Sequence, residues 1–600
     1  MSANVPTPPA IKDRKTPGVY ITELEAFPTS IVGVATAVPI FIGYTETAID
    51  PSSGKPIYLQ QVALSSMADY RTYFGAAFDT GIVAAAVSSS ECDFEASSWD
   101  GSSNPPVSEG YTVATSVTPA GTMTYVPLFN LYAAMELFFA NGGGSCFVIS
   151  VANYWGTTST TPLTDAAPVA VNASDLMAGL VVSNDIRGGT MLVVPDACLL
   201  AQADAKGALS YPGYQSVVVE MLRQSGTLQD RMAILDMPGA LVPANWSADA
   251  MEEEANAFYT AIAPAAPWFS YGATYGPALQ SSLLANTDLT YSNLSGSVAS
   301  VTLMNNLLTT QALSLYATGI AGQQTQITFP SNFTDVAAHI AAAFPVAGAA
   351  PLASDPANVV GVTQNLAVSL NGAVAVPTDS KDIKALEQYL LNALPLLANI
   401  QQILADRLNV VPPSGAIAGA WALNDTDRGV WNAPANMALN QILSPKVLLN
   451  DAQQGDYNMP LNGNAIDILR DFTNRGTVIW GARTLDGNSN DYRYIQVRRT
   501  LIYLDQSIKQ GLEAFTFAAN DGSTWVAVTA MISGFLTQLW QAGGLMGDKA
   551  SDAFTVLCGL GSTMTGEDIL NGEMVVSVTL QMIRPAEFIE LSFTQTMQSA

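Results

Sequence analysis

Histidine is almost missing from this chain of 600 residues, since His339 is the only one. Serine and cysteine hydrolases need an imidazole as their base, and most zinc sites use one as a ligand. A single histidine within an alanine-rich stretch lacks the partner residues that such sites require. The sequence therefore argues against these hydrolase classes and against histidine-based metal binding, and it favours a structural role for His339.

Charge is scarce and mostly of one sign. Charged residues make up 12% of the chain, and 50 acidic against 23 basic residues give a formal net charge of -27. Nucleic acids and anionic membranes are both recognised by clustered lysine and arginine. The composition thus predicts no nucleic-acid partner and no binding to an anionic membrane surface. Low charge is typical of chains that cover their surface with neighbouring subunits, although a large chain with big cores would share it.

Long apolar runs and paired cysteines are also lacking. The nearest approach to a membrane-spanning run, residues 341–352, is interrupted by Pro345 and Pro351, so we expect no insertion into a membrane. The segment Met1–Pro9 has neither the basic start nor the apolar stretch of a signal peptide. No Cys-x-x-Cys pair occurs, which favours free thiols and synthesis in a bacterial cytoplasm. The four cysteines are Cys92, Cys146, Cys198 and Cys558.

Motifs for nucleotide binding and acid–base chemistry are absent as well. No Gly-x-x-x-x-Gly-Lys-Ser/Thr sequence occurs. The glycines of Asn141–Gly144 follow a predicted helix and precede a predicted strand, the reverse of a phosphate-binding loop. Glu252–Glu254 are consecutive in a predicted helix and cannot converge on one ligand, and we interpret them and Glu567–Asp568 as solvated helix faces. The sequence predicts no cofactor, no metal site and no enzymatic activity.

The middle of the chain alternates between helix and strand patterns, which predicts a mainly parallel sheet covered by helices. Ser247 is the expected N-cap of one of these helices, at 248–262. The other predicted helices are 131–140 and 214–223, and the predicted strands are 38–44, 146–151, 191–194, 232–235 and 268–273.

Composition shifts divide the rest of the chain. The predicted segments are a mobile arm at 1–16, core strands within 17–128 that include an insertion at 86–122, an α/β domain at 129–277, an insertion at 278–411 and a C-terminal domain at 412–600. The first insertion is either an exposed loop or a small β structure. The second contains one clear helix, 383–407, which Pro395 should kink or split.

The last part of the C-terminal domain, from Trp525 onward, shows the pattern of an amphipathic helix followed by strands. Six apolar residues on one face predict the helix, which ends at Gly543–Gly544. They are Trp525, Val528, Ile532, Phe535, Leu536 and Leu539. Alternation then predicts two strands, at 576–582 and 589–593, separated by Arg584–Pro585.

Arginine clusters in one part of this acidic chain. The cluster consists of Arg470, Arg475, Arg483, Arg493, Arg498 and Arg499. Arginine suits ion pairs at interfaces, which favours contacts with another chain. Interleaved acidic residues offer pairing within the chain as an equal alternative. These are Asp467, Asp471, Asp486, Asp491 and Asp505.

Four segments in this order resemble the sheath proteins of contractile tails, a family shared by phage tails and phage-like injection particles. They read TPGVYI at 16–21, PIFIGY at 39–44, RGVWNAPAN at 428–436 and VIWGARTL at 478–485. The resemblance implies an α/β and α+β multidomain fold, with a C-terminal core domain that faces an inner tube and middle domains that project outward. Residues 278–411 would then be a variable outer insertion.

The resemblance also implies a mechanical function. Subunits would stack as hexameric rings around the inner tube, between a baseplate and a terminal cap, and contract without nucleotide to drive the tube through a target envelope. Strands at both chain ends would add to sheets of neighbouring subunits. The candidates are Val19, Tyr20, Ile21, Ile589, Leu591 and Phe593. For the C-terminal end, a local hairpin across Arg584–Pro585 is the alternative.

By the same resemblance, Arg470, Arg483, Arg498 and Arg499 are candidates for contacts with the tube or a neighbouring subunit. The strings at 15–21 and 40–46 look most similar to sheaths of extracellular contractile injection particles. The tail sheath of a contractile-tailed phage is the alternative, and a static shell or surface-layer protein fits the composition but not the motifs. Either sheath would be part of an assembled extracellular particle or virion.

Overall fold

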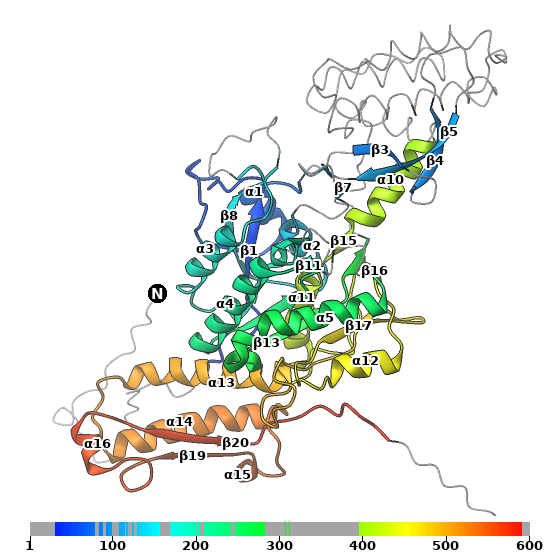
Figure 1. The fold of residues 1–600 in the computed structure, drawn as a ribbon. Coiled ribbons are helices and arrows are strands. Elements are labelled where there is room, and N and C mark those ends of the chain that lie inside the picture. Colours follow the sequence, from blue (N-terminus) through cyan, green and yellow to red (C-terminus); the bar gives the residue numbers. More distant parts are fainter. Residues whose placement is uncertain are drawn as a thin grey trace, which may run out of the picture. The chain divides into compact units, whose positions relative to one another are not determined.

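The computed structural model in Figure 1 divides into two compact units, residues 35–500 and residues 1–34 with 501–600. We call them the large unit and the small unit. The described residues are 31–78, 83–87, 92–98, 107–114, 116–117, 123–124, 129–156, 168–200, 202–203, 209–239, 241, 246–282, 307, 311 and 395–590. His339 and most of the predicted insertion 278–411 lie outside them.

An eight-stranded sheet forms the centre of the large unit, in the order β18-β17-β13-β12-β9-β1-β8-β2. The strands between the two edge strands run parallel, and β2 and β18 pair antiparallel with their neighbours. Their bounds are β1 Pro39–Thr45, β2 Val62–Leu64, β8 Cys146–Asn153, β9 Met191–Val193, β12 Met232–Asp236, β13 Gly272–Gly276, β17 Asp467–Phe472 and β18 Gly476–Ile479. The predicted parallel α/β sheet is confirmed.

Helices cover both faces of this sheet (Figure 1). Along β1, Ile40 and Ile42 belong to the apolar core that includes α3, α4 and α5, whereas the ring of Phe41 lies 5.2 Å from that of Phe138 in α2. All residues of β1 are buried, as expected for a parallel strand between two helical layers. The helices are α2 Leu131–Ala140, α3 Ala173–Ser183, α4 Pro212–Leu228, α5 Ala248–Ile262 and α11 Ser414–Arg428.

On one face, α2 and α11 pack unusually closely, because two glycines of α11 face the backbone of α2. A Cβ atom added at Gly415 would overlap the carbonyl group of Ala134, and one added at Gly419 would overlap the carbonyl oxygen of Phe138. Backbone atoms cannot move aside as a flexible side chain can. The sequence GAIAG at 415–419 is therefore a packing feature rather than a turn.

Three buried carboxylates accept hydrogen bonds from backbone N–H groups near the ends of β9 and β12. Asp196 accepts from Tyr44 N at 2.9 Å and from Asn130 N at 2.6 Å, Asp236 from Ser414 N at 2.8 Å, and Glu254 from Gly239 N at 2.9 Å. Burial raises the pKa of Asp196 to about 6, that of Asp236 to about 7 and that of Glu254 to about 8. Asp196 and Asp236 thereby connect the sheet to the starts of α2 and α11. The solvated face predicted for Glu252–Glu254 is wrong for Glu254, which is buried, whereas Glu252 and Glu253 are exposed.

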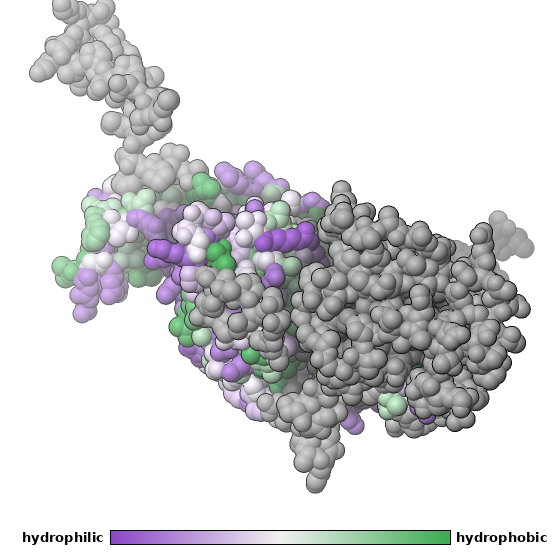
Figure 2. All heavy atoms as spheres, turned by 90° about the horizontal axis from the view of Figure 1, so that it is seen from above, coloured by the Kyte–Doolittle hydropathy of each residue, from purple (hydrophilic) through white to green (hydrophobic). Residues whose placement is uncertain are grey.

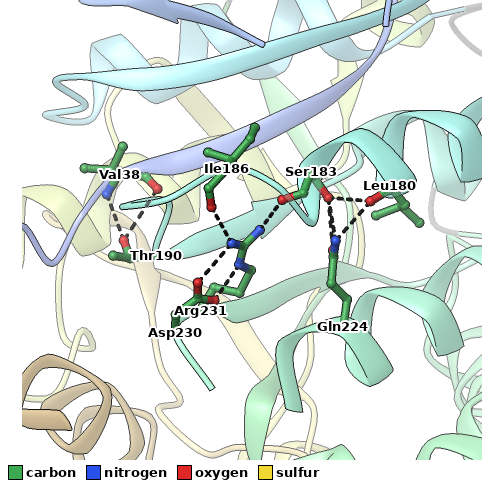
Figure 3. A network of polar contacts seen from close by, with 8 residues as sticks. All are labelled: Val38, Leu180, Ser183, Ile186, Thr190, Gln224, Asp230 and Arg231. Atoms are coloured by element: carbon green, nitrogen blue, oxygen red, sulfur yellow. Dashed lines mark hydrogen bonds and ion pairs between the residues drawn. The ribbon is translucent and has the colours of Figure 1, made fainter. Parts of the chain in front are cut away.

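A buried arginine connects helix α3 to the start of β12 (Figure 3). Arg231 is fully buried and donates to the carbonyl oxygens of Ser183 at 2.7 Å and Ile186 at 2.8 Å. It also pairs with Asp230 at 2.7 Å. The guanidinium thus satisfies carbonyl groups of the last residue of α3 and of the turn that follows it.

The two predicted insertions contact each other. Described residues of the first form an antiparallel sheet β3-β5-β4, so it is a small β structure. From the second, α10 is described from Pro395 onward, and Arg407 forms an ion pair with Asp93. Pro395 is therefore the first described helical residue, and the predicted helix 383–394 lies outside the described residues. The bounds are β3 Val83–Val87, β4 Phe94–Ser98, β5 Val107–Ala114 and α10 Pro395–Leu408.

Shorter elements complete the large unit. They are α1 Met67–Phe74, β6 Ser116–Val117, β7 Met123–Thr124, the 3-10 helix η2 Pro195–Leu200, β10 Gln202–Ala203, β11 Leu209–Ser210, the 3-10 helix η4 Ala263–Tyr271, β14 Leu279–Ser281, β15 Val410–Val411, β16 Ile442–Pro445 and α12 Asp451–Asn458. A second, three-stranded sheet has the order β15-β14-β16.

Several boundaries differ from those predicted, and helix α4, for example, spans Pro212–Leu228 where 214–223 was predicted. The strand predicted at 268–273 begins at Gly272, because Pro264 and Pro267 hold the preceding residues in η4. The eight-stranded sheet also crosses the domain boundary predicted at residue 411, since β13 pairs with β17 through Tyr275 and Asp467. By contrast, helices α2 and α5 have the predicted bounds, and Ser247 caps α5 as expected.

The small unit contains the rest of the C-terminal chain. Helix α13 is continuous across the division after Thr500. In α14 the predicted face is buried at Val528, Ile532, Phe535, Leu536 and Leu539, and Asp521 caps the helix by accepting from Thr524 N at 3.0 Å. The elements are α13 Ile495–Leu512, the 3-10 helix η7 Glu513–Phe515, α14 Gly522–Gln541, α15 Ala550–Ala553, β19 Phe554–Cys558, α16 Gly566–Leu570 and β20 Val576–Leu580.

Candidate subunit interface

The small unit contains a sheet of two antiparallel strands, β19 and β20. One face of this sheet lies along α14 (Figure 1). Burial alternates along both strands: Val556 and Val578 are half-buried, and Thr555, Leu557 and Thr579 are exposed. The strand predicted at 576–582 is confirmed over 576–580 as β20, and its partner strand is β19, which the sequence pattern did not predict.

The pairing register shows which backbone groups face outward. Gln581 N donates to Ala553 O at 2.8 Å, and Thr555 lies opposite Thr579 in the same register. Antiparallel strands alternate between hydrogen-bonded and non-hydrogen-bonded pairs. The odd-numbered residues therefore bond across the pair, and Val556 and Val578 direct their N–H and C=O groups toward the outer edges.

Both outer edges of this sheet are largely open within the described residues. No third strand pairs with β19 or β20 there, and beyond β20 only a short contact follows, in which Met546 N donates to Gln581 O at 2.9 Å. A two-stranded sheet has little stability of its own, and an open edge is a template for another strand. This edge geometry makes the sheet a candidate acceptor for strands of other chains.

The chain after β20 leads away without forming a strand through Glu590. Phe588 is 72% exposed and Ile589 is 78% exposed. The described part thus contains no hairpin across Arg584–Pro585. The other predicted exchange residues lie outside the described residues, and they are Val19, Tyr20, Ile21, Leu591 and Phe593.

Several more large apolar side chains of the small unit are exposed. They are Phe517, Val526, Met546, Leu557, Leu560 and Leu570. Exposed apolar groups in such number are typical of surfaces that another chain covers. On the face that Figure 2 shows, hydrophilic and hydrophobic residues of the described surface are interspersed.

Of the four arginines predicted to contact another chain, Arg470 is the most accessible. Its side chain is 19% exposed and pairs at 2.6 Å with Asp451, whose side chain is 92% exposed. The guanidinium also lies 5.3 Å from the ring centre of Phe472. Arg470 also donates to Gln454 Oε1 at 2.9 Å. Because Asp451 is almost fully exposed, its ion pair with Arg470 contributes little to stability.

The other three arginines are buried within the large unit. Arg498 lies between the rings of Tyr271 at 4.2 Å and Tyr492 at 3.9 Å, and Arg499 pairs with Asp425 at 2.6 Å. Arg483 is 3% exposed and stacks near Tyr494. The contacts of Arg498 and Arg499 correspond to the alternative of pairing within the chain.

Two partners of these arginines were missed because they lie far away in the sequence. Asp425 lies 74 residues from Arg499, and Tyr271 lies 227 residues from Arg498. Neither partner belongs to the acidic residues that are interleaved with the cluster. Tyrosine rings near a basic segment would have been the one available signal.

Among the described residues, no group of three or more His, Cys, Asp or Glu side chains is arranged to hold a metal ion. In that same part of the chain, no helix combines the length and apolar character needed to cross a membrane.

Comparison with known proteins gives a family for the C-terminal region. Residues 488–596 match the family profile described as phage tail sheath C-terminal domain. A tail sheath protein of Vibrio phage KVP40 is 27% identical over 195 residues, which span 32% of this chain and 28% of the relative. The matched domain includes β19, β20 and α14.

Two solved structures are similar over nearly the whole chain. The sheath complex of the extracellular contractile injection system PVC, in the contracted state, is 23% identical with a TM-score of 0.49, covering 97% of this chain and 98% of that one. The contracted helical sheath of the anti-feeding prophage is 22% identical with a TM-score of 0.49, covering 97% and 100%.

Proposed function

We propose that this chain, a tail sheath family protein through its phage tail sheath C-terminal domain, is the subunit of a contractile sheath. Subunits would stack as hexameric rings around an inner tube, joined to a baseplate and a terminal cap. The observation that carries this proposal is the two-stranded sheet β19-β20, which lies inside the matched domain and has no further strand at its outer edges among the described residues. A polymer of identical subunits can complete such a sheet with its own chain ends.

Strand exchange is the proposed linkage. In the sequence, the segment around Ile589, Leu591 and Phe593 follows β20, and the segment at Val19, Tyr20 and Ile21 precedes β1. Both alternate in polarity, so each can pair its backbone with an open edge while burying one face. The outward N–H groups of Val556 and Val578 would receive these strands. Neighbours would then stay connected while whole units rotate.

Arg470 is the arginine we propose as a direct contact with the inner tube or a neighbouring subunit. Its present partner, Asp451, is almost fully exposed. For Arg483, Arg498 and Arg499 the same role would require their side chains to leave buried positions, so we propose that they act from within the subunit. The insertion at 278–411 is proposed to lie on the outer surface of the sheath.

We further propose that contraction uses conformational energy stored at assembly and no nucleotide. The preferred setting is an extracellular contractile injection system, on the sequence motifs at 15–21 and 40–46. The tail sheath of a bacteriophage is the second candidate, because the relative with a matching segment is a phage protein.

Electron microscopy of the purified chain tests the proposed function. We expect tubes or cogwheel-shaped rings, and particles with an extended sheath should shorten in mild denaturant without ATP. Flat lattices, or a strict need for ATP during shortening, would contradict the proposal.

A matched pair of proline variants tests strand exchange. Val578→Pro removes an N–H that faces outward, whereas Ser577→Pro removes one that bonds to β19. We expect Val578→Pro to give folded subunits that form no sheath, and Ser577→Pro to destabilise the subunit itself. Deleting residues 587–600 should resemble Val578→Pro. Normal tubes from both Val578→Pro and the deletion would refute strand exchange at this sheet.

A further inference from the structure

The chain passes between its two compact units twice, after Val34 and after Thr500. The second passage lies inside α13, so a continuous helix carries the chain from one unit to the other. Residues 495–500 of this helix belong to the large unit. The two passages are far apart in sequence, and the contacts of Arg499 bring their large-unit ends together.

Within the large unit, Arg499 contacts both helix α11 and the segment that precedes β1. Its guanidinium donates to Asp425 Oδ1 at 2.8 Å and Oδ2 at 2.6 Å, and to the carbonyl oxygen of Thr36 at 3.0 Å. It also stacks 4.6 Å from the ring of Trp421. The side chains of Arg499 and Asp425 are each 4% exposed. A bidentate pair at this burial is geometrically specific and costly to break.

The carbonyl group of Thr36 is held from a second side as well. Thr190 Oγ1 donates to Thr36 O at 2.8 Å and accepts from Val38 N at 2.9 Å, a contact that Figure 3 shows between Thr190 and Val38. The segment 36–38 therefore enters β1 already attached to β9 and to α13. Among these hydrogen bonds of the segment 36–38, the bond from Arg499 is the one with a charged donor.

Within the small unit, the N-terminal segment follows α13 again. Val34 N donates to Ser507 Oγ at 3.1 Å, and Ser507 Oγ donates to Tyr503 O at 2.6 Å. A side chain at Gly33 would overlap the ring of Tyr503. Each unit thus has its own contact between α13 and the segment that precedes β1. In the large unit it joins Arg499 and Thr36, and in the small unit it joins Ser507 and Val34.

We infer that Arg499 is a positioning residue that fastens the segment 36–38 to the start of α13 and to α11, so that both chain passages leave the large unit from one anchored point. The inference rests on the proposed function in one respect. If a neighbouring subunit holds the N-terminal arm, a pull on that arm reaches the Arg499 anchor before it reaches β1. The large unit would then be moved as a whole instead of losing its first strand.

Amide hydrogen exchange on the isolated, unassembled subunit tests the anchor. In Arg499→Met we expect the amides of residues 36–38 to exchange about tenfold faster or more, because a locally stabilising contact is lost. The matched control is Arg475→Met, because Arg475 is exposed and its guanidinium donates to Asn436 Oδ1 at 2.7 Å. We expect less than about a twofold change at 36–38 in the control.

A double variant separates anchoring from general destabilisation. Arg499→Met leaves Asp425 buried without its cation, whereas Arg499→Met combined with Asp425→Leu replaces the whole pair with apolar groups, a change that often preserves stability. We expect the double variant to have the unfolding midpoint of the original chain and slow amide exchange in β12, while the amides of residues 36–38 still exchange fast. This outcome would support the anchor even if the single variant does not fold.

Slow exchange at 36–38 in the double variant would overturn the inference, because Arg499 would then act only through core packing. Unchanged exchange in a folded Arg499→Met subunit would overturn it as well. Both measurements use unassembled subunits, so they do not depend on sheath formation. Failure of the chain to form tubes would instead count against the proposed function.

Discussion

The two sheets that carry the fold and the proposed interface differ in burial and in their edges. Every residue of β1 in the large unit is buried, whereas no residue of β20 in the small unit is. The eight-stranded sheet is covered by helices on both faces and ends in antiparallel strands, while β19-β20 has helix α14 on one face and open edges within the described residues. A sheet complete in itself supports a rigid body, and an incomplete one invites a partner.

The largest predicted effect breaks the complete sheet from within. Asp196→Ala removes a carboxylate that accepts from the N–H groups of Tyr44 and Asn130. Each buried donor left without an acceptor costs about 1–3 kcal/mol, so we expect the large unit to lose about 3–5 kcal/mol of unfolding free energy. Chemical denaturation followed through tryptophan fluorescence measures this loss.

Asp50 provides the control for that substitution. It also accepts hydrogen bonds, from Ser52 and Ser53, but it lies in an exposed turn. Asp50→Ala should leave the denaturation midpoint unchanged within error, because water replaces the lost partners. Equal losses from the two substitutions would show that burial does not set the cost.

The second prediction separates the units by pH. Asp236 and Glu254 of the large unit have pKa values raised to about 7 and about 8 from 3.8 and 4.5, chiefly by burial. The folded state then keeps protons that the unfolded chain has released, so the stability of the large unit falls as pH rises through roughly 4 to 8, by at most about 1.4 kcal/mol per pH unit and group.

The small unit should respond in the opposite direction. Hydrogen bonds from Ser523 and from Thr565 lower the pKa values of its helix caps Asp521 and Asp568. The contribution of these two carboxylates to the stability of the small unit is present above the unfolded pKa of 3.8 and is lost as the pH falls below that value.

Amide exchange at several pH values reports each unit separately. In the large unit, Glu254→Gln should weaken the fall of stability with rising pH near neutrality. Glu253→Gln, at the exposed neighbouring residue, should leave that fall unchanged. A large unit whose stability rises from pH 5 to pH 8 would contradict the assigned sign.

The smallest predicted effect concerns the exposed face of the incomplete sheet. Thr579 points away from α14 on β20 and is exposed. Thr579→Ala should change the unfolding free energy of the isolated subunit by less than about 0.5 kcal/mol. Thermal unfolding by circular dichroism checks this, and a loss above about 2 kcal/mol, a size associated with buried positions, would mean that this face is already covered within the subunit.

Local patterns predicted the elements of the large unit well. Helix α5 has its predicted bounds because Ser247 and the apolar period mark them within one short stretch. The pairing of β13 with β17 could not be predicted, because the strands are separated in sequence by the insertion at 278–411. Long-range pairing leaves no trace in local periodicity.

The candidate interface was predicted only in part. Alternation at 576–580 identified β20, but β19 is a short strand directly after α15, and no sequence pattern linked the two. The buried arginines were equally ambiguous, since burial of Arg499 depends on Asp425 from a different helix. Composition and spacing indicate which residues form contacts, and the fold decides which contacts stay inside the subunit.

Amide exchange of β19 and β20, compared between free subunits and assembled tubes, tests the central claim most directly. In the free subunit the outward N–H groups of Val556 and Val578 should exchange fast, and in tubes they should become protected by added strands. The inward N–H groups of Thr555 and Thr579 already bond across the pair and should change much less. Equal exchange of Val556 and Val578 in subunits and tubes would contradict the account.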